Sequence, residues 1–395
     1  MQYETKNVYE KEHDLSEKIT DSADGKSKII YEPFDKMQQF MIDVFVKVGV
    51  PQPDAKICAE VLIEADKRGI DSHGVGRFRP IYIDRIKAGL QNPVTDFEII
   101  RESPTTAVVN GHNGMGQVIA KKSMDLAIGK AKKYGMGMVA ARDSTHYGIA
   151  GYYAIMAAKE NMIGITGTNA RPSIAPTFGT ENMLGTNPLV YGMPTDEDFP
   201  FVIDCATSIT QRGKIELYER EGKKLPVGWV IDQEGNTKTD PTIVLQELNS
   251  GKCALAPLGG IGEDLAGYKG YGYATVVEIL SSSLQAGLFL KDLSDVNSEG
   301  KKVPSRLGHF FIAIDIASFI EPDSFKKNTG EILRQLRNSK KAPGQERIYT
   351  AGEKEYLAWL ERKDKGVPLN EVMQKIIKQT RDEYGLDQYK FGFDV

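Results

Sequence analysis

Apolar positions recur at helical spacing in the first part of the chain. Phe34, Met37, Met41 and Phe45 predict an amphipathic helix over about 34–48. Pro53-Asp54 opens a second helix that reaches Ala65, and a third is expected from about 77 to 88, where Gly89 ends it. The chain therefore begins with a helical layer.

The pattern changes after Asn92-Pro93. Short runs rich in β-branched and apolar residues predict strands, and longer stretches between them predict helices. The strands are expected at 97–100, 106–109, 136–140, 163–166, 188–191, 201–204 and 310–315, and the helices at about 117–134, 149–160 and 270–286. The middle of the chain is thus expected to form a mixed α+β unit.

Helical spacing returns after Asp323, in one stripe that includes Phe325 and Leu336 and another that includes Val372 and Ile376. Two helical ends around one mixed middle predict a discontinuous helical domain with the sheet domain inserted into it. We expect the division 1–33, a polar and loosely ordered arm; 34–92, the first half of the helical domain; 93–320, the α+β domain; and 321–395, the second helical half.

Composition narrows the class of protein. The 395 residues are 41% hydrophobic and 26% charged, with a net charge of −4, so nucleic acid is not a favoured partner. There is no signal-peptide core and no apolar run long enough for a membrane helix, and three widely spaced cysteines fit a reducing cytosol, so a cytoplasmic protein is expected. Five histidines, at 13, 73, 112, 146 and 309, show no metal-binding pairing, so no metal is expected.

The most informative stretch is the turn Ser72-His73-Gly74, followed four positions after the histidine by Arg77. If helix resumes at Gly74, the imidazole and the guanidinium lie near one helix face. An imidazole exchanges protons near neutral pH, and a guanidinium binds a carboxylate through two hydrogen bonds. A reductase of small keto acids needs both groups, although the turn alone fits a histidine that caps a helix better.

Glycine-rich segments offer a second signal. The dinucleotide fingerprint G-x-G-x-x-G is absent with correct spacing and context, so a Rossmann domain is not expected. The segments 111–116 and 267–272 still place backbone N–H groups, including that of Gly116, at a predicted helix N-terminus, and Lys269 adds a charge to the second. Each segment therefore fits either a phosphate site or a tight turn.

Three polar stretches near predicted strands complete the candidates. His146 lies in a turn between a strand and a helix, Asn187 precedes a proline and suits hydrogen bonding to an amide or hydroxyl, and Asp204 interrupts an apolar strand. A buried carboxylate needs a partner, so we expect Asp204 to meet a histidine, a lysine or a ligand hydroxyl. Each stretch taken alone also fits a structural role.

Together these segments resemble the type 2 malate/L-lactate dehydrogenase family, also called sulfolactate dehydrogenase-like. The matching segments, in the family's order over about residues 35–390, are ADKRGIDSHGVGRF, STHYGIAGYYA, GTNARPSIAPTFGTENMLGTNPL, FVIDCATS, LPVGWVID and GYKGYGYATVVEIL. The resemblance implies an α+β fold with a mixed, largely antiparallel, non-Rossmann cofactor domain, and a homodimer.

The resemblance also assigns roles to residues. His73 matches the proton-transferring histidine, Arg77 the arginine that holds the substrate carboxylate, and His146 a second histidine that is the acid or base in some members. Ser72 and Asn187 are the further candidates for substrate binding, and Asp204 for orienting a histidine. The candidate cofactor residues are Gly116, Ile203, Asp204, Cys205, Ala206, Thr207, Ser208, Tyr268, Lys269, Gly352 and Glu353, although Ala351 stands where the family's late motif has proline.

The implied activity is reversible hydride transfer between a nicotinamide cofactor, NAD with NADP left open, and C2 of a small 2-hydroxy or 2-oxo acid of the malate or L-lactate type. A long form of the loop 259–267 favours that branch. Reduction of a cyclic imino acid such as piperideine or pyrroline carboxylate stays open, as does dehydrogenation of ureidoglycolate or diketogulonate type. A nucleotide-binding protein without catalysis is the alternative from another class.

Overall fold

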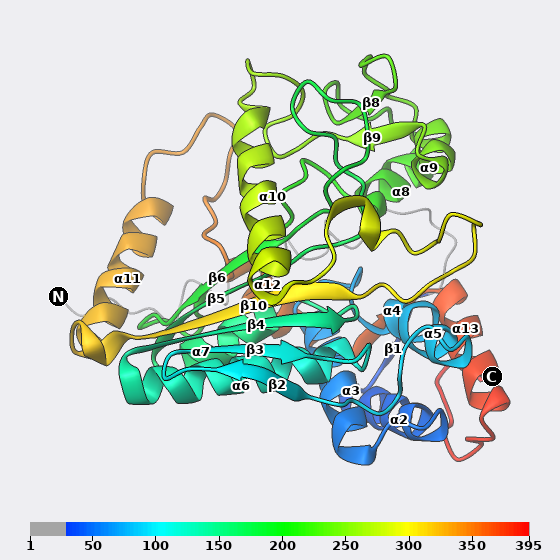
Figure 1. Cartoon of the computed structure of the whole chain (residues 1–395), viewed down its shortest axis with the longest axis horizontal. Coiled ribbons are helices and arrows are strands. Elements are labelled where there is room, and N and C mark those ends of the chain that lie inside the picture. The colour runs from blue at the N-terminus through cyan, green and yellow to red at the C-terminus, as the bar shows by residue number, and fades with distance from the viewer. Residues whose placement is uncertain (1–28, 395) are drawn as a thin grey trace.

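The centre of the molecule is a seven-stranded sheet in the order β2-β3-β4-β10-β5-β6-β7 (Figure 1). The computed structural model describes residues 29–394. Only β3 and β4 run parallel, and every other neighbouring pair is antiparallel. The strands are β2 (Glu98–Glu102), β3 (Thr106–Asn110), β4 (Met136–Ser144), β5 (Met162–Thr168), β6 (Leu189–Met193), β7 (Phe201–Cys205) and β10 (Leu307–Asp315).

Helices cover both faces of this sheet. α6 (Gly116–Tyr134) and α7 (Gly151–Lys159) lie on one face, and α10 (Gly267–Ser282) lies on the other (Figure 1). The first face is closed by a core in which alanines of α6 and α7 pack on Val139, Phe311 and other strand residues. The small alanine side chains let both helices approach the sheet closely, which fixes where the loop between β4 and α7 emerges.

A small lobe lies between β7 and α10 and has its own core. It contains α8 (Arg212–Arg220), α9 (Pro241–Ser250) and the antiparallel pair β8 (Val230–Asp232) and β9 (Cys253–Leu255). The sequence pattern did not predict these elements, because each strand has three residues and shows too little alternation to be recognised. Three short 3-10 turns, Ser283–Gln285, Leu290–Leu293 and Ile316–Ser318, follow α10 or β10.

The two ends of the chain share another core. α2 (Phe34–Lys47) and α3 (Gln52–Lys67) pack with β11 (Val367–Leu369) and α13 (Glu371–Glu383), and in Figure 1 the blue helices α2 and α3 lie near the red α13. α12 (Glu353–Arg362) contributes Trp359 to this core. α11 (Pro322–Arg337) instead holds the turn between β6 and β7, through an ion pair of Arg334 with Asp196.

The expected loose arm is wrong at its last residues. Ile30–Glu32 form strand β1, which pairs antiparallel with β11. The Glu32 side chain is buried there and accepts a hydrogen bond from Lys36. The rest of the arm, residues 1–28, lies outside the described residues.

The helix expected over 77–88 is interrupted. α4 (Val75–Arg77) leads into a π-helical turn over Phe78–Ile83, and α5 (Asp84–Lys87) follows. Pro80 lies inside the turn and has no N–H to donate, so it disrupts the regular ladder of helical hydrogen bonds. The wider turn changes the direction of the side chains that follow it.

The predicted fold class is confirmed, with helices around a mixed and mostly antiparallel sheet. The seven strands predicted in the middle of the chain are all present and form this one sheet. Within residues 29–394, no helix combines the length and the apolar character that crossing a membrane requires.

Candidate active site

The turn that carries His73 is held by a buried carboxylate. Asp66, near the end of α3, is almost completely buried and accepts a hydrogen bond of 2.8 Å from the backbone N–H of Val75. Burial raises the pKa of Asp66 well above its ordinary value. Gly74 lies so close to Asp66 that a Cβ on residue 74 would be 1.9 Å from Oδ1 of the Asp66 carboxyl, so only glycine fits there. The position of residues 70–74 is therefore tightly determined.

Arg77 extends from the first turn of α4. Its Nε donates a hydrogen bond of 2.6 Å to the carbonyl of Ser72, which orients the guanidinium toward the histidine turn. Within residues 29–394 no carboxylate forms an ion pair with Arg77, whereas Arg79, two residues later, pairs with Glu383. The terminal amino groups of Arg77 are thus available for a substrate carboxylate.

His146 lies just after β4, where α6 begins beside it. The N–H of Gly116 donates to the Thr145 hydroxyl at 2.9 Å, and a Cβ on Gly116 would lie 2.3 Å from the Thr145 carbonyl oxygen. The glycine thus permits close packing of helix on strand end, and it uses its N–H for that contact. Gly116 supports the histidine loop rather than presenting its N–H to a phosphate.

The two predicted histidines meet. The rings of His73 and His146 stack with centroids 5.7 Å apart and planes 20° apart. Ser72 Oγ lies 2.9 Å from Nδ1 of His73, and the hydroxyl of Tyr82 lies 2.6 Å from Nδ1 of His146. Burial and the Arg77 charge lower the pKa of His73 to about 4, and burial together with His73 lowers the pKa of His146 well below its ordinary value. Both imidazoles are neutral at pH 7.

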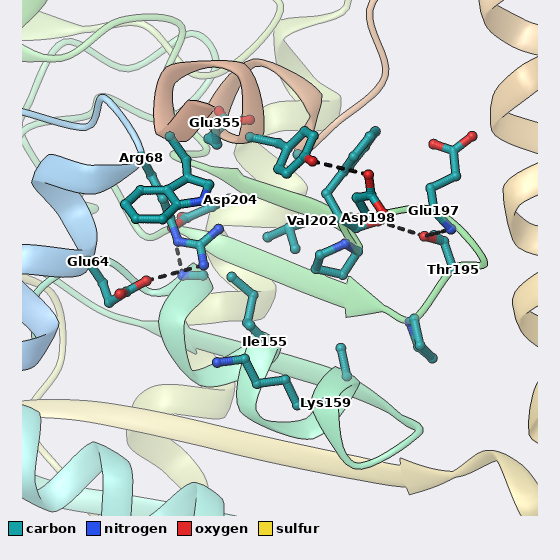
Figure 2. Close-up of a pocket in the computed structure, with 18 of the residues that line it drawn as sticks. Glu64, Arg68, Ile155, Lys159, Thr195, Glu197, Asp198, Val202, Asp204 and Glu355 are labelled. Atoms are coloured by element: carbon teal, nitrogen blue, oxygen red, sulfur yellow. Dashed lines mark hydrogen bonds and ion pairs between the residues drawn. The ribbon is translucent and has the colours of Figure 1, made fainter. Parts of the chain in front are cut away.

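A cavity of about 540 Å³ lies between α3, α7, β7 and α12 (Figure 2), and none of His73, Arg77 and His146 is among its lining residues. Ile70 and Ile149, each three residues from one of the histidines, belong to its wall. In this view Arg68, Asp204 and Glu355 gather at one end of the cavity, and Thr195 and Glu197 at the other.

Asp204 projects from β7 into the cavity and accepts a hydrogen bond of 2.7 Å from the N–H of Gly151 at the start of α7. The Asp204 side chain contacts solvent through the cavity, but protein surrounds it on the other sides. The resulting desolvation raises the pKa of Asp204 to about 6, although the hydrogen bond from Gly151 lowers it. Among the described residues, the hydrogen-bond partner of Asp204 is thus a backbone N–H and not the histidine or lysine that the sequence predicted; a ligand hydroxyl stays a prediction.

The cavity wall combines both signs of charge. Carboxylates suit ribose hydroxyls, and lysine or arginine side chains suit a diphosphate. The volume of the cavity and the charges of its wall fit a dinucleotide. The charged residues of the wall are Glu64, Lys67, Arg68, Lys159, Glu197, Asp198, Asp204, Lys326 and Glu355.

Gly352 also lines the cavity. It belongs to the segment Ala351-Gly352-Glu353, which resembles a cofactor contact of the family. A Cβ on Gly352 would lie 2.6 Å from the Pro200 carbonyl oxygen, so the glycine lets the start of α12 approach β7. Glu353 is buried and pairs with Arg347, and it accepts a hydrogen bond from the Thr350 N–H. In this chain Glu353 fastens the loop before α12.

Other predicted cofactor and substrate residues lie away from the cavity wall. Lys269 and Tyr268 are exposed on the first turn of α10, where the ammonium lies 5.8 Å from the tyrosine ring centroid. Asn187 is buried under α10 and donates a hydrogen bond of 2.7 Å to Glu278.

The segment after Asp204 leads from the sheet into the small lobe. Ile203 and Cys205 alternate with Asp204 along β7 and so point to its other face. The Thr207 hydroxyl donates to the Asn187 carbonyl at 2.9 Å, and Ser208 is buried in a bridge to Pro257. Ala206 is half-buried between them.

Sequence reasoning missed Tyr82 and Asp66. Tyr82 is completely buried, and its position in an apolar helical stripe looks like ordinary core. Asp66 offered a recognisable signal, because an acidic residue on the buried side of an otherwise apolar helix requires a partner.

Comparisons with known proteins show the family to which the chain is similar. A family model described as malate/L-lactate dehydrogenase matches residues 33–378. Malate dehydrogenase of Pyrococcus horikoshii is 45% identical over 350 residues, which cover 89% of this chain and 93% of that protein. L-sulfolactate dehydrogenase of Methanocaldococcus jannaschii is 41% identical, with 89% and 96% covered. A crystal structure of malate dehydrogenase from Entamoeba histolytica superposes with a TM-score of 0.88 at 46% identity, covering 93% of this chain and all of that one.

Proposed function

Because the chain belongs to the malate/L-lactate dehydrogenase family, we propose that it oxidises malate at C2 with NAD and catalyses the reverse reduction. The resemblance drawn from six motif segments is confirmed, and so is the prediction of an oxidoreductase. One observation carries the proposal: an arginine without a carboxylate partner among the described residues lies beside two stacked, neutral histidines.

Arg77 binds the C1 carboxylate of the substrate in this proposal. Its Nε is already held by the Ser72 carbonyl, so the two terminal amino groups form a fixed pair of donors. A carboxylate bound there presents its neighbouring carbon, C2, to the histidines. Binding energy is thereby used to position the reacting centre.

His73 moves the proton in this proposal. As a neutral imidazole it accepts the C2 hydroxyl proton during oxidation, and its conjugate acid returns the proton during reduction. Its pKa of about 4 arises from burial and from Arg77. A substrate carboxylate neutralises that cation and raises the pKa toward the working pH, so substrate binding prepares the acid form that reduction needs.

A nicotinamide cofactor, when bound, supplies or accepts the hydride at C2. We propose that it binds in the cavity between α3, α7, β7 and α12, whose wall includes Asp204 and Gly352 and reaches Ile70 and Ile149 near the histidines in the chain. Carboxylates of Asp204 and Glu355 would accept hydrogen bonds from ribose hydroxyls and repel a 2′-phosphate, while Arg68 at the same end of the cavity is paired with Glu64. This charge pattern supports NAD as the preferred cofactor.

The test is a substrate panel on the purified protein with NAD and NADP, followed by nicotinamide absorbance. Malate, L-lactate, sulfolactate and ureidoglycolate are offered for oxidation, and pyrroline and piperideine carboxylates for reduction. We expect malate with NAD to give the highest kcat/KM. A higher value on another substrate would replace malate, and cofactor binding without turnover on any compound would favour the non-catalytic alternative.

We also propose a homodimer, as the family resemblance implies. Exposed apolar side chains on and after α10 support it, because a helix that is apolar on every side needs a covering partner. They are Tyr268, Tyr273, Val276, Ile279, Leu284 and Phe289. Light scattering after size-exclusion chromatography tests this, and a mass of one chain across the micromolar range would contradict it.

A further inference from the structure

We propose that Tyr82 is a positioning residue which, together with the backbone N–H of Gly148, holds His146 in the tautomer protonated on Nε2. His146 then serves as a neutral hydrogen-bond donor to the C2 oxygen, and the proton transfer belongs to His73. The inference rests on the proposed function for the identity of that oxygen. The tautomer itself follows from the contacts of His146 alone.

The first contact comes from the π-helical turn. Tyr82 is completely buried in that turn, with its ring packed edge-on against Phe45 at 6.2 Å between centroids. Its hydroxyl lies 2.6 Å from Nδ1 of His146, and the two rings meet at 66°. The phenol has little freedom to turn away from the imidazole.

The second contact decides the tautomer. The N–H of Gly148 points at the same Nδ1 from 3.3 Å. A backbone N–H only donates, so Nδ1 has to offer its lone pair, and the ring proton of the neutral imidazole is on Nε2. Burial raises the pKa of Tyr82 well above its ordinary value, although hydrogen bonds from Gln117 and from the Gly148 N–H act in the opposite direction, so the phenol keeps its proton and can donate it to Nδ1.

The same contacts disfavour an imidazolium at His146. A proton on Nδ1 could be accepted by the Tyr82 hydroxyl, but it would also face the Gly148 N–H, which only donates and would lose Nδ1 as its acceptor. The ionisable groups that act on His146 are His73, Arg77, His309 and Arg85, and each lowers its pKa. Among the described residues, none of the groups acting on its pKa is a carboxylate that would stabilise the charged ring.

His73 has a different partner. Its Nδ1 faces the hydroxyl of Ser72 at 2.9 Å, and a hydroxyl both donates and accepts. Rotation of that hydroxyl satisfies His73 whether Nδ1 is protonated or not. The two histidines therefore differ in one contact: the surroundings of His73 accept both protonation states, whereas the Gly148 N–H makes the surroundings of His146 favour the neutral state.

The direct test is NMR of the unliganded protein with ¹⁵N-labelled histidine. Long-range proton–nitrogen correlations distinguish protonated from unprotonated ring nitrogens, and a His146→Gln variant identifies the signals of His146. We expect Nδ1 of His146 to be unprotonated at pH 7. A protonated Nδ1 would overturn the proposal.

The second measurement is the kinetics of Tyr82→Phe, which removes one hydroxyl. We expect kcat for malate to fall about tenfold, as for the loss of one buried hydrogen bond, with KM nearly unchanged. We also expect the NMR spectrum to show a mixture of His146 tautomers. Tyr153→Phe is the control, because its buried hydroxyl donates to the Tyr147 carbonyl and contacts no histidine.

Equal kcat and an unchanged His146 spectrum in Tyr82→Phe would refute the positioning role. A drop of the same size in Tyr153→Phe would assign the effect to general packing and refute the role too. If no 2-hydroxy acid is turned over, the proposed function fails, whereas the tautomer remains decided by the spectrum.

Discussion

Two histidines near the same end of the sheet have opposite surroundings. His309, on β10, is completely buried, with Nδ1 at 2.7 Å from the Thr168 hydroxyl and Nε2 at 2.8 Å from the Ser144 hydroxyl. Its ring stacks on Tyr147 with centroids 4.4 Å apart. His146 lies two residues after β4. Its Nδ1 contacts the Tyr82 hydroxyl and the Gly148 N–H, and its ring stacks on His73.

The difference separates a histidine bonded at both ring nitrogens from the histidine that we propose to be functional. Both nitrogens of His309 are used by the protein, so the ring has nothing left to offer a substrate. Within residues 29–394 no hydrogen bond occupies Nε2 of His146, which lies near the arginine that we propose to bind the substrate carboxylate. Burial lowers the pKa of both rings, so a shifted pKa alone does not distinguish them.

The largest effect is expected from His73→Ala. If His73 carries the proton, kcat for malate falls by about 10²- to 10⁴-fold, the range for loss of a general acid or base. Fluorescence titration of reduced cofactor should give an unchanged Kd. His309→Gln is the comparison variant and should keep most of its turnover. Near-normal kcat in His73→Ala, with His146→Ala inactive, would move the proton transfer to His146.

The next effect is expected from Arg77→Gln. Two charge-assisted hydrogen bonds to the substrate carboxylate are lost, so KM for malate should rise by about 10- to 100-fold. Loss of the cation also raises the pKa of His73, so the limb of the pH profile assigned to His73 should move to higher pH.

Arg79→Gln is the matched control, because Arg79 is held by Glu383 and Thr380. It should leave KM for malate unchanged. Equal KM increases in both variants would show that general charge at this turn, rather than a carboxylate clamp, attracts the substrate.

Local patterns predicted most of the fold and part of the site. Each strand of the main sheet is long enough to show apolar character, and α2, α3 and α6 show clear helical spacing. The lobe with β8 and β9 lacks such length, and the π turn depends on Pro80 in an otherwise helical pattern.

The sequence predicted those residues of the candidate site that belong to a recognisable local motif. His73, Arg77 and His146 were identified from motifs, and the structure brings these three together. Tyr82 was not identified, because its contact with His146 joins residues 64 positions apart and no spacing pattern encodes it. Lys269 was assigned from a motif, but its place on an exposed turn of α10 depends on the tertiary fold.

A smaller effect is expected from Asp204→Asn. If the carboxylate accepts hydrogen bonds from a ribose, the KM for NAD should rise about tenfold. The Asp204 pKa of about 6 also predicts a pH dependence. The carboxylate is charged above this pH, so the KM of the unmodified protein for NAD should rise as the pH falls below 6. The variant should lose that dependence.

Asp198→Asn tests whether the position of the charge matters. Asp198 lines the same cavity and accepts from the Tyr356 hydroxyl at 3.2 Å. Its substitution should change the KM for NAD less than Asp204→Asn and leave the pH dependence in place. The reverse ranking would move the ribose site to the Asp198 end.

The smallest effect on turnover is expected from His309→Gln, which should instead change stability. Burial lowers the pKa of His309 from 6.5 to about 3, so between these values the unfolded chain binds a proton that the folded protein does not. The contribution of neutral His309 to the free energy of unfolding is complete above pH 6.5. It falls by about 1.4 kcal/mol per pH unit as the pH drops from 6.5 toward 3. Urea unfolding of His309→Gln should show a pH slope smaller by that amount between pH 4 and 6, and a stability lower by about 1–3 kcal/mol at pH 7.5 from the disturbed hydrogen bonds. An unchanged slope, or a kcat reduced as strongly as in His73→Ala, would erase the distinction between the two histidine sites.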